Sequence, residues 1–369
     1  MAASNLGMEG PVGARVRIAG REVDYFAGTG YLGLQNHPEV VEAAAEAARR
    51  YGISTATSRG GYGEHPLYAE LEGEARAFFG AEKVLYFPSG YQGMAVLTQA
   101  TGGAFEHIFI DLSAHFSLWD AAYATNRPIT PFHHLRPESL AARLREDLQP
   151  GERPLVLSDG VFPISGEIAP LPDYLALAEE YGGRVYLDDA HSVGVLGEHG
   201  RGTPELFSVS DSRCRTSGTL AKALGGYGGI IWGEAGWVEE IDRNSRVLAG
   251  ASPPPLVAAA ASAAALRVAR TSPGLLAALR SNVARARRSL TELGWEMGDS
   301  PAPILCLEAR EGMNLIRLRD RLFERGIAVD YVRSYTSAPP GGGLRIAVFA
   351  THTAEQIDRL VEEIGKISS

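Results

Sequence analysis

One lysine of this chain stands in a setting where an amine can react. Lys222 lies among small residues and glycines in residues 216–229, between two segments that read as strands. A lysine that forms an imine must lose its proton near neutral pH, and a tight, partly desolvated site favours that loss. Thr219 lies three residues earlier, where its hydroxyl can bind a phosphate. The alternative is a Gly-rich surface turn that contains a lysine.

Two adjacent acids follow a second apolar segment. Residues 185–187 read as a buried strand, Asp188 and Asp189 come directly after it, and His191 is three residues beyond Asp188. Successive strand side chains point to opposite faces, so Asp188, which ends the apolar run, is a better candidate than Asp189 for a carboxylate that pairs with the nitrogen of a pyridine ring. Pyridoxal 5'-phosphate (PLP) requires such a carboxylate, because a protonated pyridine ring stabilises a carbanion. The acids can instead cap the following turn.

Three further segments offer groups that PLP uses. Ser89, Gly90 and Tyr91 form a strand-to-helix turn whose N–H groups can bind a phosphate, although a serine there also caps a helix. His115 follows a strand end, where its ring can stack on a flat ligand or serve the structure alone. Arg345 lies within a segment that otherwise reads as a buried strand. A buried guanidinium needs a bidentate partner, either a substrate carboxylate or an internal acid.

Short apolar segments alternate with helical patterns through the first two thirds of the chain. Helices are expected from residue 38, from 66 to 80, from about 114 and near 175. This rhythm predicts an α/β fold with a mainly parallel central sheet, helices on both faces and functional loops at the carboxyl ends of the strands. The expected strands are residues 84–87, 107–110, 155–157, 185–187 and 229–232.

The two ends of the chain read differently from the middle. Residues 15–18 and 23–26 are expected as strands of a short arm. Ser252 precedes three prolines, which end one helix and start another. Beyond them, two long helices, strands at 304–307, 327–332 and 344–348, and a terminal helix from 353 predict a smaller α/β domain. We therefore divide the chain into an N-terminal arm, 1–35, a large PLP-binding domain, 36–250, and a C-terminal domain, 251–369.

The composition of the chain limits the partners and the cellular compartment that we expect. A formal net charge of −9 argues against a nucleic-acid partner, which usually requires a basic surface. The two cysteines are far apart, which indicates a reduced, cytoplasmic environment and no metal site. The first twenty residues lack the apolar stretch of a secretory signal, and no apolar run is long enough to span a bilayer.

In their order along the chain, these segments resemble the α-oxoamine synthases, fold-type-I PLP-dependent enzymes that include 8-amino-7-oxononanoate synthase and serine palmitoyltransferase. The resemblance runs from about Tyr31 to the end of the chain. It implies the fold-type-I architecture and a homodimer with shared active sites. Six matches carry it, at residues 89–92, 159–162, 188–191, 197–202, 218–222 and 344–346.

The resemblance also implies a role for each matching residue. Lys222 would carry PLP as a Schiff base, Asp188 would pair with the ring nitrogen and His115 would stack on the ring. His191 would reach the phenolic oxygen, and Arg345 would bind the carboxylate of an amino acid. The implied cofactor-binding residues are Ser89, Gly90, Tyr91, His115, Asp159, Asp188, His191, Thr219, Lys222 and, from the neighbouring subunit, Ser252.

The chain departs from the family pattern at three places. Thr29 and Gly30 precede Tyr31, where the family has an asparagine. Residues 163–166 read Pro-Ile-Ser-Gly instead of Ser-Met-Asp-Gly, which removes a hydroxyl from near the phenolic oxygen, and residues 58–64 also differ. These changes leave the cofactor site in place and concern the substrates.

The implied activity is an acyl transfer. An amino acid and an acyl thioester, such as an acyl-CoA, would condense with loss of carbon dioxide to an aminoketone, with Lys222 as acid and base. One alternative is a PLP-dependent aminotransferase, lyase or racemase that uses the same site without a thioester. Another is a scaffold or regulator of the same fold that has lost catalysis. The joint presence of Lys222, Asp188, His191 and Arg345 counts against the last.

Overall fold

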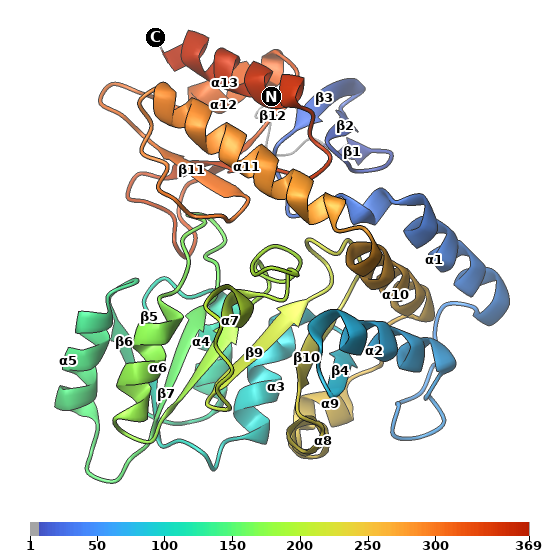
Figure 1. The fold of residues 1–369 in the computed structure, drawn as a ribbon, viewed down its shortest axis with the longest axis vertical. Coiled ribbons are helices and arrows are strands. Elements are labelled where there is room, and N and C mark those ends of the chain that lie inside the picture. The colour runs from blue at the N-terminus through green and yellow to red at the C-terminus, as the bar shows by residue number, and fades with distance from the viewer. Residues whose placement is uncertain (1–6, 369) are drawn as a thin grey trace.

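A seven-stranded sheet forms the lower half of the molecule in Figure 1, in a computed structural model that describes residues 7–368. Residues 1–6 and 369, where the predicted arm begins and the predicted C-terminal domain ends, lie outside the described part. The strand order is β4-β10-β9-β8-β7-β5-β6, and only β10 runs against the others. The predicted mainly parallel sheet is thus confirmed. Its strands are β4 (Lys83–Phe87), β5 (His107–Asp111), β6 (Ile129–Phe132), β7 (Pro154–Asp159), β8 (Arg184–Asp188), β9 (Cys214–Thr219) and β10 (Gly229–Gly233).

Alternation along the strands builds a core on each face of this sheet. Ile108 and Ile110 of β5 pack with α3, α4 and α8, whereas Phe109 between them packs with α5 and α6 on the other face. The predicted cover of helices on both faces is therefore present. These helices are α3 (Gly93–Ala100), α4 (Phe116–Ala124), α5 (Pro137–Asp147), α6 (Leu171–Glu179) and α8 (Ala235–Asn244).

A second, smaller sheet has three antiparallel strands in the order β11-β14-β13 and lies in the upper half of Figure 1. The N-terminal strands form a separate sheet in the order β1-β2-β3-β12, in which β3 pairs with β12 from the C-terminal part of the chain. These strands are β1 (Met8–Glu9), β2 (Arg15–Ile18), β3 (Arg21–Tyr25), β11 (Ile304–Glu308), β12 (Ile327–Ala328), β13 (Asp330–Val332) and β14 (Gly343–Ala347). The helices nearby are α11 (Gly274–Glu292), α12 (Leu315–Glu324) and α13 (Ala354–Ser368).

Helix α10 (Leu256–Thr271) packs against α1 (Pro38–Tyr51) and α2 (Pro66–Phe79). It therefore contacts the part of the chain assigned to the large domain, and the boundary after residue 250 stays a prediction. The shorter helices are η2 (Leu34–Asn36), η3 (Gly90–Gln92), α7 (Thr203–Leu206) and α9 (Arg246–Gly250). No helix within residues 7–368 has both the length and the apolar character needed to cross a membrane.

One predicted strand was wrong, and two strands of the large sheet, β6 and β9, were not predicted. Residues 327–332 were expected as one strand, but β12 pairs with β3 and β13 pairs with β14, because three consecutive buried residues, 327–329, carry the chain from one sheet to the other. Strand β9 was not expected at all. Its sequence, Cys-Arg-Thr-Ser-Gly-Thr, lacks an apolar pattern, yet it lies inside the large sheet between β8 and β10.

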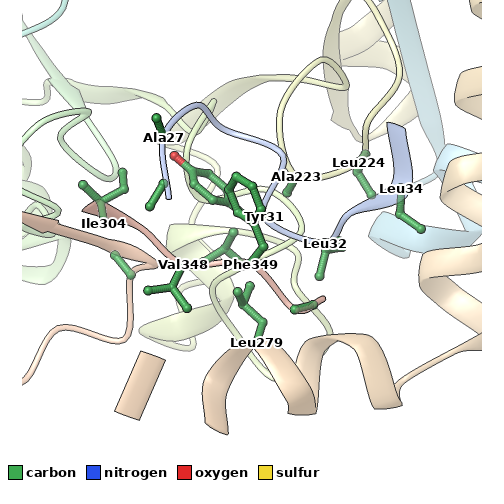
Figure 2. Packing of buried hydrophobic residues seen from close by; sticks show 14 of the residues in the cluster. Ala27, Tyr31, Leu32, Leu34, Ala223, Leu224, Leu279, Ile304, Val348 and Phe349 are labelled. Carbon is green, nitrogen blue, oxygen red and sulfur yellow. The ribbon is translucent and has the colours of Figure 1, made fainter. Parts of the chain in front are cut away.

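The largest apolar core joins the arm, α10, α11 and the small sheet. Figure 2 shows Tyr31 within it, near Val348 and Phe349, which follow β14, and above Leu279 of α11. Because residues from distant parts of the chain meet in this core, it fixes the small sheet relative to the loops that follow the large one.

Candidate active site

Polar residues end four neighbouring parallel strands of the large sheet. Asp111 ends β5, Asp159 ends β7 and Asp188 ends β8. Thr219 ends β9, and Lys222 follows three residues later. Parallel strands share their carboxyl edge, so these groups gather there. A cavity of about 250 Å³ at this edge is lined by Pro88, Ser89, Gly90, Tyr91, His115, Ser117, Asp159, Asp188, Ala190, His191, Thr219, Ala221, Lys222, Tyr227 and Gly228. Every residue of the predicted cofactor set except Ser252 is among them.

Lys222 is half-buried in this cavity. Its ammonium group makes no hydrogen bond or ion pair with any other residue in the range 7–368. Burial lowers the pKa of Lys222 to about 8, although the nearby Asp188 and Asp159 oppose the shift. The amine is therefore partly unprotonated near neutral pH, which imine formation requires.

The two adjacent acids occupy different surroundings. Asp188 lines the cavity, and its Oδ1 accepts a hydrogen bond from the backbone N–H of Ala190 at 2.9 Å. Asp189 points away and accepts hydrogen bonds from the Thr203 hydroxyl at 2.6 Å and the Thr203 N–H at 3.0 Å. Burial raises the pKa of Asp189 to about 7 despite these bonds. Of the two, Asp188 is therefore the carboxylate available to a ligand.

His115 is held at both ring nitrogens. Its Nδ1 lies 2.7 Å from the Ser117 hydroxyl, and its Nε2 lies 2.7 Å from the Tyr335 hydroxyl. The Ser117 hydroxyl also lies 3.4 Å from Asp188 Oδ2, so His115 and the acid share a partner. Sequence reasoning missed both hydroxyls. Ser117 stands two residues after His115 at a helix start, which is a usable signal, but Tyr335 is 220 residues away and gave none.

Asp159 supports the same histidine from its backbone side. Its Oδ2 accepts a hydrogen bond from the His115 N–H at 2.8 Å. Asp159 and Asp188 are direct neighbours on β7 and β8. Burial, followed by the proximity of Asp188, raises the pKa of Asp159 well above its usual range. The cavity therefore holds two acids that resist being ionised together.

Arg345 lies beside the cavity and is tied to it through Tyr31. The guanidinium is 5% exposed and donates to the carbonyls of Pro163 at 2.7 Å and Gly28 at 2.9 Å. Its third bond, at 3.3 Å, is to the Tyr31 hydroxyl, which lies 2.7 Å from Nδ1 of His191. Among the described residues Arg345 has no acidic partner, so the internal salt bridge considered as an alternative is not formed.

The opposite side of the cavity suits a phosphate. A side chain at Gly90 would place its Cβ 2.7 Å from Cβ of Thr219, so only glycine allows this approach of η3 to β9. Ser89, the residue before η3, accepts from the Tyr91 N–H at 3.3 Å. PLP requires particular chemical groups around it: an amine, a carboxylate, imidazoles, and a helix start flanked by hydroxyls, and the cavity has all of them. The residues present therefore fit this cofactor.

Ser252 lies outside the cavity. It lines a larger groove, of about 750 Å³, together with Arg59 and Tyr86, and only Pro88 borders both this groove and the cavity. Arg59, in the segment 58–64 that departs from the family pattern, pairs there with Glu72 at 2.7 Å. The chemical groups, rather than the volume, identify the smaller cavity as the site. Within one chain Ser252 does not join it.

Fold and cavity together define a fold-type-I PLP-dependent transferase. Residues 27–364 match the family described as aminotransferase class I and II. The chain is 33% identical over 360 residues to the 8-amino-7-oxononanoate synthase of Alkaliphilus metalliredigens, covering 98% of this chain and 91% of that one. The serine palmitoyltransferase of Sphingomonas wittichii has a TM-score of 0.91 at 26% identity, covering 99% and 92% of the two chains.

A serine palmitoyltransferase variant from S. paucimobilis, solved with bound PLP and myriocin, has a TM-score of 0.90 at 25% identity, covering 99% of this chain and 92% of that one. The chain belongs to the class I and II aminotransferase family and, within it, to the α-oxoamine synthases, as the ordered motifs predicted. It is a PLP-dependent enzyme of the acyltransferase type.

Proposed function

We propose that the enzyme condenses an α-amino acid with an acyl thioester, releasing carbon dioxide and the free thiol and leaving an α-aminoketone. The product would be of the kind made by the 8-amino-7-oxononanoate synthases to which the chain is similar over nearly its whole length. The observation that carries the proposal is Arg345, a buried cation without an acidic partner in residues 7–368, tied to the same cavity as an unpaired lysine. The carboxylate of an amino acid would bind Arg345, and its amine would take the place of Lys222 on the cofactor.

The side chains around the cavity would each perform a different part of the reaction. PLP, when bound, supplies an aldehyde for the amine and a ring that accepts the electron pair released at the α-carbon. Lys222, with a pKa of about 8, can remove the α-proton and return a proton later. Asp188 faces the cavity and would keep the ring nitrogen protonated, while Arg345 would hold the carboxylate of the amino acid.

The remaining residues of the cavity would orient the cofactor and enclose it. His115 is fixed by the Ser117 and Tyr335 hydroxyls and would cover one face of the ring. His191 would donate to the phenolic oxygen. Backbone N–H groups at Gly90 and Tyr91, with the hydroxyls of Ser89 and Thr219, would bind the phosphate. Asp159 acts through the backbone of His115, to which it is bonded.

We further infer a cytoplasmic homodimer in which Ser252 of one subunit contributes to the site of the other. Two free cysteines, Cys214 and Cys306, support a reducing compartment. The position of Ser252 in a separate groove that Pro88 connects to the cavity supports a contribution across the subunits. Mixing Lys222→Ala protein with a variant disrupted at Ser252 tests this, because mixed dimers should regain one working site. An active monomer in sedimentation would contradict it.

The activity test uses a panel of amino acids and acyl-CoA thioesters with PLP-loaded enzyme. Release of the free thiol and of labelled carbon dioxide from the amino acid's carboxyl carbon should occur together, and only when both substrates are present. Amino-acid turnover without a thioester would instead indicate an aminotransferase, lyase or racemase. No turnover of any amino acid, with PLP bound, would favour a scaffold.

A further inference from the structure

Tyr31 lies in the largest apolar core and carries a polar group to the edge of the active site. It follows β3, is 0% exposed, and has its backbone carbonyl fixed by the Ala350 N–H at 2.7 Å. Its hydroxyl contacts His191 and Arg345, which are 160 and 314 residues away in the sequence. A phenol packed this firmly has little freedom to turn toward other partners. Sequence reasoning used Tyr31 only as part of a motif.

The direction of each hydrogen bond follows from the chemistry of the three groups. A guanidinium only donates, so the Tyr31 oxygen accepts from Arg345 at 3.3 Å. The buried hydroxyl of Tyr31 has no other acceptor within residues 7–368, so its proton goes to Nδ1 of His191, at 2.7 Å, because the reverse arrangement would leave that proton unbonded. Nδ1 is therefore the bare nitrogen of the ring.

The charge state of His191 completes this assignment. Burial lowers the pKa of His191 well below its ordinary value, and the charged or polar groups that face it, Lys222, Arg345 and His115, act in the same direction. The ring is therefore neutral near pH 7 and carries one proton. With Nδ1 occupied as an acceptor, that proton lies on Nε2.

We propose that Tyr31 is a positioning residue, which holds His191 in the tautomer protonated on Nε2 and couples it to Arg345. Because His191 lines the cavity, Nε2–H is then a donor for an oxyanion bound there. The opposite tautomer would present a lone pair to the same oxyanion and repel it. The Tyr31 hydroxyl thus decides whether His191 attracts or repels an oxyanion in the cavity.

The coupling to Arg345 rests on the role that the proposed function gives that residue. Three of the five N–H groups of Arg345 are bonded, to Pro163, Gly28 and Tyr31, and two have no partner within residues 7–368. A carboxylate on these two would offset the charge that Tyr31 and His191 experience. Occupancy of the amino-acid site would then change the strength of the His191 donor through a chain of two hydrogen bonds.

The tautomer is tested without cofactor or substrate. In apo protein labelled with ¹⁵N at histidine, long-range proton–nitrogen spectra distinguish a protonated ring nitrogen from a bare one, and His191→Gln assigns the signal. We expect Nε2–H in the wild type and a mixture of tautomers in Tyr31→Phe, which keeps the ring and its packing. Tyr25→Phe is the matched control, since Tyr25 is buried nearby and its hydroxyl makes no hydrogen bond within residues 7–368. A proton on Nδ1 in the wild type, or no change in Tyr31→Phe, would overturn the proposal.

The coupling is tested with propanoate, which has a carboxylate and no amine, on PLP-loaded enzyme. The pH midpoint of the cofactor's visible absorbance should shift with propanoate in the wild type and in Tyr25→Phe. In Tyr31→Phe the shift should fall at least about threefold, because the hydrogen-bonded path is removed. An undiminished shift in Tyr31→Phe would overturn the coupling. A wild type that ignores propanoate would count against the carboxylate role of Arg345 in the proposed function, and the tautomer experiment would then decide on Tyr31 alone.

Discussion

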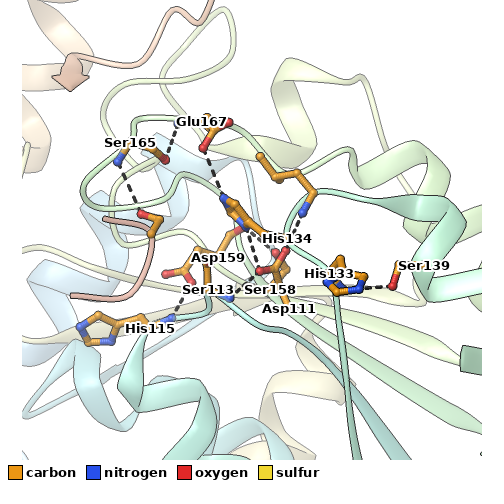
Figure 3. A network of polar contacts seen from close by, with 12 residues as sticks. Asp111, Ser113, His115, His133, His134, Ser139, Ser158, Asp159, Ser165 and Glu167 are labelled. Atoms are coloured by element: carbon orange, nitrogen blue, oxygen red, sulfur yellow. Dashed lines mark hydrogen bonds and ion pairs between the residues drawn. The ribbon is translucent and has the colours of Figure 1, made fainter. Parts of the chain in front are cut away.

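Two polar networks lie at the same edge of the large sheet, and they differ in whether their charged groups are paired. In the first, His134 lies between two acids, with Nδ1 2.9 Å from Asp111 and Nε2 3.3 Å from Glu167 (Figure 3). Asp111 also accepts the backbone N–H groups of Ser113 and Leu135. Burial opposes a charge on His134, but the bonds to its two acids outweigh it and raise its pKa to about 9.

The second network, around the cavity, leaves its charges unpaired. Lys222 has no bonded partner in residues 7–368, and burial lowers its pKa to about 8. Asp159 and Asp188 lie side by side on β7 and β8, and the pKa of Asp159 is raised by burial and by its neighbour. A network complete in the bare chain stabilises the fold, whereas an incomplete one is arranged for a ligand. This contrast predicts opposite consequences for substitutions in the two regions.

The largest effect is expected at Lys222. Lys222→Ala removes the only amine in the cavity, so PLP can no longer be attached covalently and activity should fall about a thousandfold or more. Borohydride reduction followed by peptide mapping measures the attachment directly. Lys83→Ala, which removes a lysine of β4 paired with Glu239, should leave labelling unchanged. A label on any lysine other than Lys222 would contradict the assignment.

The adjacent acids should separate activity from stability. In Asp188→Asn the ring nitrogen loses its anion, and turnover should fall about a hundredfold while PLP still binds. Asp189→Asn replaces a carboxylate bonded to Thr203, so unfolding should become easier by about 1–2 kcal/mol with turnover per folded molecule nearly kept. Steady-state kinetics and urea unfolding of both variants make the comparison. The reverse pattern would assign the cavity role to Asp189.

His134→Gln should destabilise the apo protein by about 1–2 kcal/mol at pH 6, a value reduced from the full pKa shift because His134 is partly exposed to solvent. The folded pKa of about 9 lies above the ordinary value of 6.5. The stabilisation is therefore complete below pH 6.5 and is lost as the pH rises through 9. Urea unfolding at several pH values should show wild type and variant converging above pH 9. A constant gap across that range would show that packing, rather than charge, holds His134.

Most of the residues that line the cavity could be named from the sequence, because several of them lie at the ends of strands. Asp188 follows one predicted strand and His115 follows another, so a parallel sheet brings these two together. Thr219 and Lys222 belong to β9 and the turn after it, and only their glycine-rich surroundings marked them. The spacing of Asp188 and Asp189 also gave the face of each, since side chains alternate along a strand.

What could not be predicted depends on contacts between distant segments. Tyr335 bonds His115 across 220 residues, and Tyr31 bonds Arg345 across 314, and no local pattern specifies either pair. Strand β9 was missed for a different reason. It has no run of apolar residues to mark it as a buried strand, and it lies in the sheet because β8 and β10 hydrogen-bond to it on both sides.

The smallest predicted effect has the opposite sign to that of His134→Gln. Lys222→Met should stabilise the apo protein, because a desolvated ammonium without a bonded anion is replaced by an apolar side chain of similar length. The folded pKa of about 8 lies below the ordinary 10.5, so the cost of the charge is complete below pH 8 and gone above 10.5. The full shift corresponds to ~3.4 kcal/mol, but water in the cavity screens a half-buried lysine and Asp188 and Asp159 attract it, so we expect about 1 kcal/mol at pH 7. Urea unfolding of PLP-free protein at pH 7 and above pH 10.5 should show a gain that disappears, with Lys83→Met as the control that shows none. A loss of stability at pH 7 would mean that Lys222 is well paired in the bare chain, and the contrast between the two networks would fail.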